Sequence, residues 1–188
     1  MVVAMNQEKK IIHPLKFIMY IGCASIVMIF AGLSSAYLVK RNQANWLTYN
    51  IPIIFFYSTA VIILSSITLM LSRKSFINRE MKHYKMWLLF SVILGFTFIF
   101  LQYLGFKELW SNGITLTRNV AFSFLYVIVG VHALHVLGGA IALLIMYLKS
   151  FSKSRKNYNQ IYIDLMNTYW HFVDFLWIYL LIFLIYIG

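Results

Sequence analysis

The stretch VAFSFLYVIVGVHALHVLGGAIALLIMYL, residues 120–148, contains no Lys, Arg, Asp or Glu. A helix needs roughly 20 apolar residues to cross the hydrocarbon core of a bilayer, so this stretch is long enough to span it. Four other apolar runs meet the same requirement, and together the spans cover residues 15–39, 51–71, 86–106, 120–148 and 163–187. We therefore predict an all-α fold, a polytopic transmembrane bundle of five helices that forms a single transmembrane domain over residues 1–188.

Composition also indicates a membrane protein. The chain is 62% hydrophobic and only 11% charged, whereas roughly 25% of residues are charged in an average soluble domain. Cys23 is the only cysteine, which excludes a disulfide framework or a thiolate metal site within the chain. The opening MVVAMNQEKK is polar where the apolar part of a cleavable signal should begin, so we expect no cleaved signal there.

Basic residues divide unequally between the two sides of the predicted bundle. On the side of the N-terminus are Lys9, Lys10, Lys16, Arg73, Lys74, Arg79, Lys82, Lys85, Lys149, Lys153, Arg155 and Lys156. The other side has Lys40, Arg41, Lys107 and Arg118. The positive-inside rule therefore predicts a cytoplasmic N-terminus and an outside C-terminus. This topology accounts for the net charge of +11, with anionic lipid head groups as counter-ions, and we expect no nucleic-acid partner.

Small and hydroxyl-bearing residues predict close contacts between helices. Small side chains let backbones approach each other in a membrane. In the first and fourth spans these are Gly22, Ala24, Ser25, Ala31, Gly32, Ser35, Ala36, Gly130, Ala133, Gly138 and Gly139. In the second span, hydroxyl groups can hydrogen-bond across helices or to their own carbonyls. These residues are Ser65, Ser66 and Thr68.

Two pairs of polar residues lie deep in the last two spans. His132 and His135 are near the middle of the fourth span, and His171 and Asp174 are at similar depth in the fifth. Each pair is three residues apart and shares a helix face. An unpaired carboxylate at this depth is costly, and no Lys or Arg lies in the middle of a span. We therefore predict a structural His–Asp hydrogen-bond cluster that fastens the fourth span to the fifth.

Three other roles for these residues remain open. A haem could be held by His171 and a histidine of the fourth span, although Asp174 would then lie beside the iron without a Cys or Met ligand. A proton relay needs polar groups that reach both surfaces, and Gln102 is the only other obvious candidate. A small transporter needs a broken helix, for which only Gly138–Gly139 offers a place. We favour the structural cluster and expect no catalytic residue and no metal site.

Two of these segments carry a resemblance to the subunit III family of the haem–copper terminal oxidases. YWHFVDFLW, residues 169–177, resembles part of the last helix of that family and contains Tyr169 and Trp170 of its motif. The fourth span resembles the family pattern G-x-H-x-L-H-V-x-x-G, here Gly130, His132, Leu134, His135, Val136 and Gly139. Asp164 stands seven residues before His171, where the family usually has Glu.

The resemblance implies a non-catalytic subunit III of a haem–copper cytochrome c oxidase, in the short five-helix form of bacteria. It implies a place in the bacterial inner (cytoplasmic) membrane, within a proton-translocating complex of aerobic respiratory electron transport. The chain would pack on subunit I, with subunit II as a further partner, stabilise subunit I and support its proton uptake. Haem and copper would belong to the partner subunits, and phospholipid would bind in a cleft. A quinol-oxidase subunit III, a nitric-oxide-reductase accessory chain and a b-type haem electron carrier are the alternatives.

One position departs from the family. The helix that matches the first span commonly carries a carboxylate there, and the aligned residue here is Ile26. Because Ile26 cannot ionise, no role of that carboxylate is expected in this chain. The departure favours a supporting subunit over a proton channel.

Overall fold

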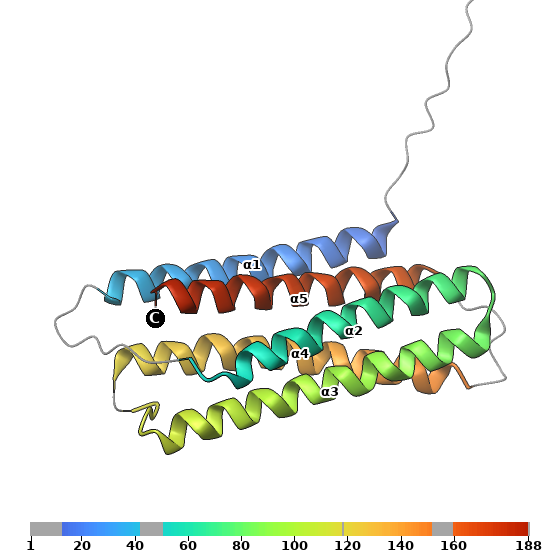
Figure 1. The fold of residues 1–188 in the computed structure, drawn as a ribbon. Helices are drawn as coiled ribbons and strands as arrows, with labels where there is room; N and C mark the ends of the chain where they lie inside the picture. Colours follow the sequence, from blue (N-terminus) through green and yellow to red (C-terminus); the bar gives the residue numbers. More distant parts are fainter. Residues whose placement is uncertain (1–12, 42–50, 118, 152–159, 188) are drawn as a thin grey trace, which may run out of the picture.

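The computed structural model describes residues 13–41, 51–117, 119–151 and 160–187. Within these ranges the chain forms only helices (Figure 1): α1 (Pro14–Arg41), α2 (Ile54–Ile77), α3 (Met81–Ser111), α4 (Val120–Lys149) and α5 (Gln160–Ile187). All five are long and apolar enough to cross a membrane. The predicted all-α bundle of five membrane-spanning helices is therefore confirmed.

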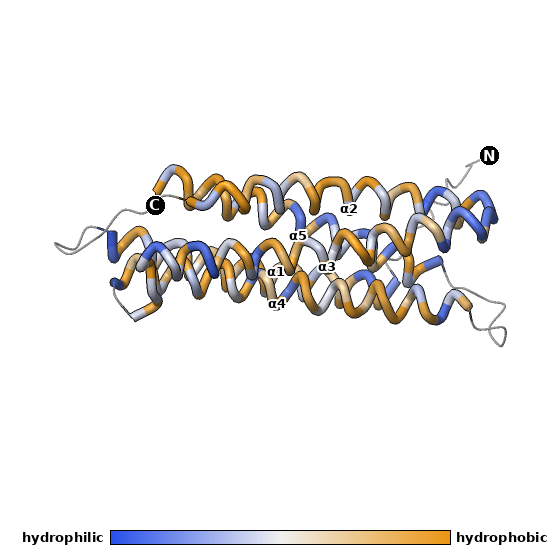
Figure 2. Tube along the Cα trace, turned by 60° about the horizontal axis from the view of Figure 1, so that its bottom comes forward, coloured by the Kyte–Doolittle hydropathy of each residue, from blue (hydrophilic) through white to orange (hydrophobic). Residues whose placement is uncertain are grey.

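Several helices are longer than the apolar runs that predicted them. α2 continues past Leu71 to Ile77, and α3 begins at Met81 rather than at Met86. Backbone hydrogen bonding does not stop where the hydrocarbon core ends, so a helix can extend into the headgroup region with charged side chains. Figure 2 shows this pattern, with an apolar middle and hydrophilic ends.

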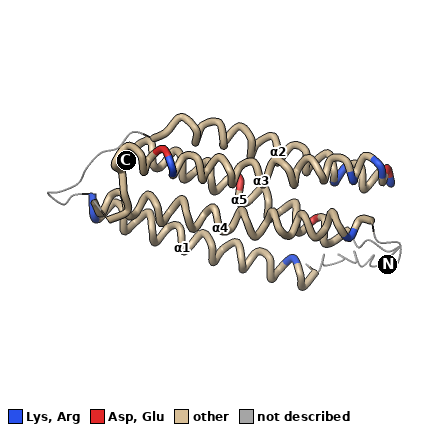
Figure 3. The backbone as a smooth tube through the Cα atoms, turned by 90° about the horizontal axis from the view of Figure 1, so that it is seen from below, with Lys and Arg blue, Asp and Glu red and all other residues tan. Residues whose placement is uncertain are grey.

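Lys and Arg residues gather at the two ends of the bundle (Figure 3). At the end where α1 begins, the described ones are Lys16, Arg73, Lys74, Arg79, Lys82, Lys85 and Lys149. At the opposite end they are Lys40, Arg41 and Lys107. Lys9, Lys10, Arg118, Lys153, Arg155 and Lys156 lie outside the described residues, as does the opening MVVAMNQEKK. Which end faces the cytoplasm stays a prediction of the positive-inside rule.

Helices α2 to α5 form a four-helix bundle. Each packs on the next along the chain, and α5 packs back on α2, which closes the ring. α1 lies outside the ring on α4 and α5 (Figure 1), and its described residues do not pack on α2 or α3. In the apolar part of α1 that can span the membrane, only 11% of the residues are buried, against 50% in the same part of α5. α5 is thus the central helix and α1 the peripheral one.

The small residues of α1 do not make the contacts predicted for them. The face of α1 that packs on α4 and α5 carries large side chains such as Phe30 and Tyr37, which are buried. The small residues lie on exposed positions: Gly22, Ala24, Ser25, Ala31, Gly32, Ser35 and Ala36. The prediction was wrong for this helix because composition alone does not say which face of a helix turns toward its neighbours.

Buried positions in the ring alternate in steps of three and four residues. In α3 they include Tyr84, Leu88, Ser91, Gly95, Phe98, Gln102, Gly105 and Leu109. This repeat, which averages 3.5 residues, produces left-handed coiled-coil packing. The same geometry is common in membrane bundles.

A serine repeats every seven residues along the face of α2 that packs on α3. Ser58 Oγ accepts a hydrogen bond from Gln102 Nε2 at 3.0 Å. Ser65 Oγ donates to the Ser91 carbonyl at 3.2 Å, and Ser72 Oγ donates to the Tyr84 carbonyl at 3.3 Å. Thr68 Oγ1 lies 2.8 Å from Ser91 Oγ. These bonds confirm that the hydroxyl groups of the second span bond across helices.

Helices α2 and α3 end in the same hydrogen-bonded turn, a Schellman motif. After α3, Gly113 has φ 76° and the Ile114 N–H donates to the Leu109 carbonyl at 3.0 Å. After α2, Arg79 has φ 61° and the Glu80 N–H donates to the Ser75 carbonyl at 2.9 Å. The left-handed backbone suits glycine but strains a side chain with a Cβ atom, so Arg79 carries strain that Gly113 avoids.

Replacement of Arg79 by glycine should therefore stabilise the chain. We expect the free energy of unfolding to rise by about 0.5–1 kcal/mol, because relief of strain exceeds the entropy cost of glycine. The matched control is Asn78→Gly, at a neighbouring residue with φ −74°. This variant should lower the free energy of unfolding by about 0.5–1 kcal/mol. Titration of the purified chain with SDS measures both changes. If both variants lower the free energy of unfolding by the same amount, Arg79 is not strained.

Candidate functional site

The motif YWHFVDFLW on α5 connects this helix to the rest of the ring. The Tyr169 hydroxyl donates to the backbone carbonyl of His135 on α4 at 3.1 Å. Trp170 is buried between two glycines of other helices. A Cβ atom on Gly95 of α3 would lie 2.9 Å from the Trp170 ring, and one on Gly139 of α4 would lie 3.0 Å from it. Only glycine at both places leaves room for this indole ring.

The next polar residues of the motif face α2. His171 Nδ1 shares a hydrogen bond with Ser66 Oγ. Asp174 is only 5% exposed and lies beside the same Ser66. Among the described residues, its two carboxyl oxygens accept no hydrogen bond from a histidine or a cationic side chain. Trp177 also bonds to α2, because its Nε1 donates to Thr59 Oγ1 at 2.8 Å.

The two histidines of α4 both pack on Phe30 of α1 but differ in their other contacts. His132 is fully buried and stacks on Trp177 with ring centroids 5.1 Å apart. Phe30 and Phe98 surround the same ring at 6.2 and 6.1 Å, and its two nitrogen atoms have no partner among the described residues. His135 Nδ1 lies 2.8 Å from the carbonyl of Val131 in its own helix.

The His–Asp hydrogen-bond cluster stays a prediction, and Ser66 of α2 is the residue that lies against both His171 and Asp174. The structure does not join Asp174 to any histidine by a hydrogen bond, and His171 bonds to α2 rather than to α4. The prediction relied on equal depth in the membrane, but residues of equal depth can face different neighbours around the helix axis. The contacts that join α4 to α5 include the Tyr169 hydroxyl, the Trp170 ring against Gly139, and the stack of Trp177 on His132.

Because Asp174 bonds to no histidine or cationic side chain among the described residues, its replacement should not destabilise the chain. We expect Asp174→Leu to leave the free energy of unfolding unchanged or to raise it by about 1 kcal/mol, since a buried polar group without a hydrogen bond is unfavourable. Ser66→Ala, which removes the partner of His171, should instead lower it by about 1 kcal/mol. Titration with SDS separates the two results. A loss for Asp174→Leu as large as that for Ser66→Ala would contradict this expectation and favour the pairing hypothesis.

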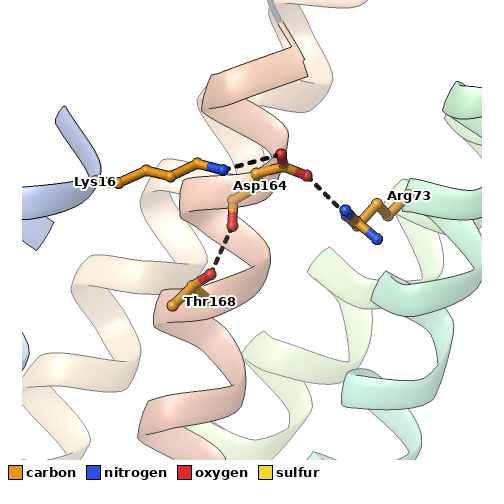
Figure 4. A network of polar contacts seen from close by, with 4 residues as sticks. All are labelled: Lys16, Arg73, Asp164 and Thr168. Atoms are coloured by element: carbon orange, nitrogen blue, oxygen red, sulfur yellow. Dashed lines mark hydrogen bonds and ion pairs between the residues drawn. The ribbon is translucent and has the colours of Figure 1, made fainter. Parts of the chain in front are cut away.

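An ion-pair triad joins three helices at the end where α1 begins (Figure 4). Arg73 Nε of α2 donates to Asp164 Oδ1 of α5 at 2.8 Å, and Lys16 Nζ of α1 lies 3.6 Å from Asp164 Oδ2. The Asp164 side chain is 18% exposed, whereas Lys16 and Arg73 are 39% and 40% exposed. Thr168 Oγ1 donates to the Asp164 carbonyl at 2.9 Å. The triad thus attaches the peripheral α1 to the ring.

The sequence contained part of the signal for this triad. The distribution of charge already placed Lys16 and Arg73 on the same side of the membrane, and Asp164 was recognised as a motif position. Their contact needed the arrangement of α1 and α2 on either side of α5, which the sequence does not specify. The contacts of Trp177 with Thr59 and of Trp170 with Gly95 were missed, because an apolar sequence does not indicate which neighbouring helix a side chain faces.

The other motif positions have mixed surroundings. Gly139 packs against Tyr169 and Trp170, as predicted for small residues, whereas Gly130 and Gly138 would have nothing within 4 Å of an added Cβ atom. Ile26 is partly buried and packs on the core. Within the described ranges, no three His, Cys, Asp or Glu side chains come close enough to hold a metal ion.

Comparisons with known proteins agree on one family. The model of the family described as cytochrome c oxidase subunit III matches residues 6–188. A cytochrome c oxidase subunit 3 from Bacillus sp. (strain PS3) is 26% identical over 88% of this chain and 81% of its own length. One from Corynebacterium diphtheriae is 30% identical over 83% and 80%. A cytochrome bo(3) ubiquinol oxidase subunit 3 from Buchnera aphidicola is 28% identical over 86% and 88%.

Proposed function

Because the chain belongs to the cytochrome c oxidase subunit III family, we propose that it is a non-catalytic subunit that stabilises the catalytic subunit I and supports its proton uptake. A subunit III works within a complex, so the chain has other oxidase subunits as partners. In this proposal, the direct partner is subunit I, with subunit II in the same complex. Haem and copper belong to those partners.

The observation that carries the proposal is the family match over nearly the whole chain, residues 6–188. The contacts of α5 are consistent with a supporting role, because Tyr169, Trp170 and His171 each hold a neighbouring helix rather than face an open cavity. A rigid bundle of this kind can stabilise a larger membrane subunit by packing against it.

The chain is a multi-pass membrane protein. We place it in the bacterial inner membrane, because the similar proteins come from bacteria. The N-terminus would face the cytoplasm, where the positive-inside rule puts the end with more cationic residues.

Copurification tests the proposed assembly. The tagged chain is extracted from membranes in a mild detergent, and its companions are identified by mass spectrometry and by their haem spectrum. We expect subunits I and II to copurify with haem. A stable partner without haem, or a Soret band from this chain purified alone, would contradict the proposal.

Removal of the chain tests the supporting role. An oxidase prepared from cells that lack the chain should unfold at a lower temperature and lose activity faster during turnover than the complete enzyme. Adding back the purified chain is the control and should restore both properties. If both properties are unchanged without the chain, the supporting role is wrong.

The similarity to a ubiquinol oxidase subunit makes a ubiquinol a second candidate, beside cytochrome c, for the electron donor of the complex. In that case the copurified complex would oxidise a ubiquinol and not reduced cytochrome c. Oxygen consumption with each donor in turn distinguishes the two complexes.

A further inference from the structure

The tip of the α2–α3 hairpin, residues 74–85, carries a surplus of positive charge (Figure 3). Its acid, Glu80, already has a neighbour, because His83 Nδ1 lies 3.2 Å from Glu80 Oε2. Its cations are Lys74, Arg79, Lys82 and Lys85. The first three of them are exposed and form no ion pair with a described residue. The hairpin tip therefore presents free cationic groups at the end of the bundle where α1 begins.

Arg79 occupies a position of the hairpin tip that suits glycine. Its φ of 61° is left-handed, whereas the same turn after α3 has Gly113. The side chain of Arg79 is exposed, and the hydrogen bonds of Arg79 with described residues involve its backbone alone. Strained backbone at residues other than glycine is concentrated at functional sites, where a side chain is retained despite its cost. The strain at Arg79 thus indicates that its guanidinium group binds a partner outside the described part of the chain.

The hairpin tip extends past the lipid head groups. The apolar run of α2 ends at Leu71, and the helix continues for six more residues to Ile77, which is about 9 Å. The headgroup region on one side of a bilayer is only about 5–7 Å thick. Figure 1 shows the same arrangement, with the α2–α3 connection farther out than the start of α1. Arg79, which follows α2, thus lies in the aqueous phase, whereas Lys74 lies at the depth of the lipid phosphates.

We propose that Arg79 and Lys82 bind an acidic segment of another protein at the surface of the membrane. A guanidinium group matches a carboxylate with two parallel hydrogen bonds, a geometry that lysine does not provide. Lipid phosphates are the other anions near the hairpin tip. Lys74 is at their depth on a regular helical backbone, so lipid does not account for an arginine at a strained position. The proposal concerns the hairpin tip alone and does not rest on the proposed role in an oxidase.

Binding of an acidic peptide tests the hairpin tip in the full chain. The chain is placed in nanodiscs of zwitterionic phosphatidylcholine, and a fluorescent peptide of six glutamates is titrated by anisotropy. We expect the peptide to bind and Arg79→Gly to weaken its binding about fivefold, the upper range for an exposed ion pair. Because Arg79→Gly should also stabilise the chain, the weaker binding would not come from a loss of the fold. Arg79→Lys keeps the charge but not the two parallel hydrogen bonds, so it should weaken binding about twofold.

The matched control is Lys107→Gln, which removes one positive charge from an exposed residue at the opposite end. It should leave peptide binding unchanged. Unchanged binding in Arg79→Gly, equal weakening in Lys107→Gln, or no binding of the peptide by the unmodified chain would each overturn the proposal. If Arg79→Gly instead weakens the binding of phosphatidylglycerol and not of the peptide, the hairpin tip binds lipid and the proposal is wrong.

Cross-linking identifies the partner in membranes from cells that make the chain. A carbodiimide joins a lysine amine to a carboxylate that it touches, with no spacer between them. We expect Lys82 to be joined to Asp or Glu of a second protein, about fivefold less in Arg79→Gly than in the unmodified chain or in Lys107→Gln. A link from Lys82 to an acid of this chain itself, or equal links in all three, would overturn the proposal.

Discussion

Replacement of Trp170 by alanine is expected to lower the free energy of unfolding by about 3 kcal/mol, at the lower end of the range for a buried tryptophan. The lower end applies because separated helices remain in lipid, so the indole ring loses its packing contacts but not its apolar surroundings. The cavity should persist, since Gly95 and Gly139 have no side chains that could move into it. Titration of the purified chain with SDS measures the loss.

The matched control for this variant is Trp110→Ala. Trp110 is 61% exposed, and its replacement should change the free energy of unfolding by at most about 0.5 kcal/mol. In the proposed complex, the Trp170 variant should also copurify with less of the other oxidase subunits, because the surface made by the ring would no longer be rigid. Equal losses for the two tryptophans would contradict the place given to Trp170 at the centre of the ring.

The fold could be predicted because the bilayer imposes strong conditions on a spanning segment. Five apolar runs of sufficient length predict five helices, and these are the helices of the structure. The hydroxyl groups of α2 also bond across helices as predicted, since a buried hydroxyl in a membrane finds a partner or bonds to its own backbone. The position of α1 outside a ring of four helices could not be predicted from the sequence, because every span is similarly apolar.

The candidate site was predicted in part. The motif residues Tyr169 and Trp170 and the position Asp164 do hold contacts, yet their partners were not foreseen. Depth along a helix follows from counting residues, but the direction of a side chain depends on how the helix is rotated against its neighbours. Asp174 illustrates this limit, because at the depth of the histidines it lies beside Ser66 of α2. The adjacent Gly138 and Gly139 show the same limit, since Gly139 packs against Trp170 and Gly138 does not.

These two adjacent glycines allow a sharp test of the packing. We expect Gly139→Leu to lower the free energy of unfolding by about 3 kcal/mol, because the new side chain overlaps the rings of Tyr169 and Trp170. Gly138→Leu, one residue away and in open space, is the matched control. It should stabilise the helix by up to about 1 kcal/mol, since leucine favours a helix more than glycine does. Similar losses for both variants would mean that α4 is rotated differently from the structure.

A double variant shows whether the loss in Gly139→Leu comes from Trp170 itself. Trp170→Ala opens the space that the leucine side chain needs, so the two losses should not add. We expect the double variant to be more stable than the sum of the single variants by about 1–3 kcal/mol, the coupling typical of residues in direct contact. Gly138→Leu combined with Trp170→Ala should be additive within about 0.5 kcal/mol. Additive losses for Gly139→Leu and Trp170→Ala would show that the indole ring does not occupy the glycine gap between α3 and α4.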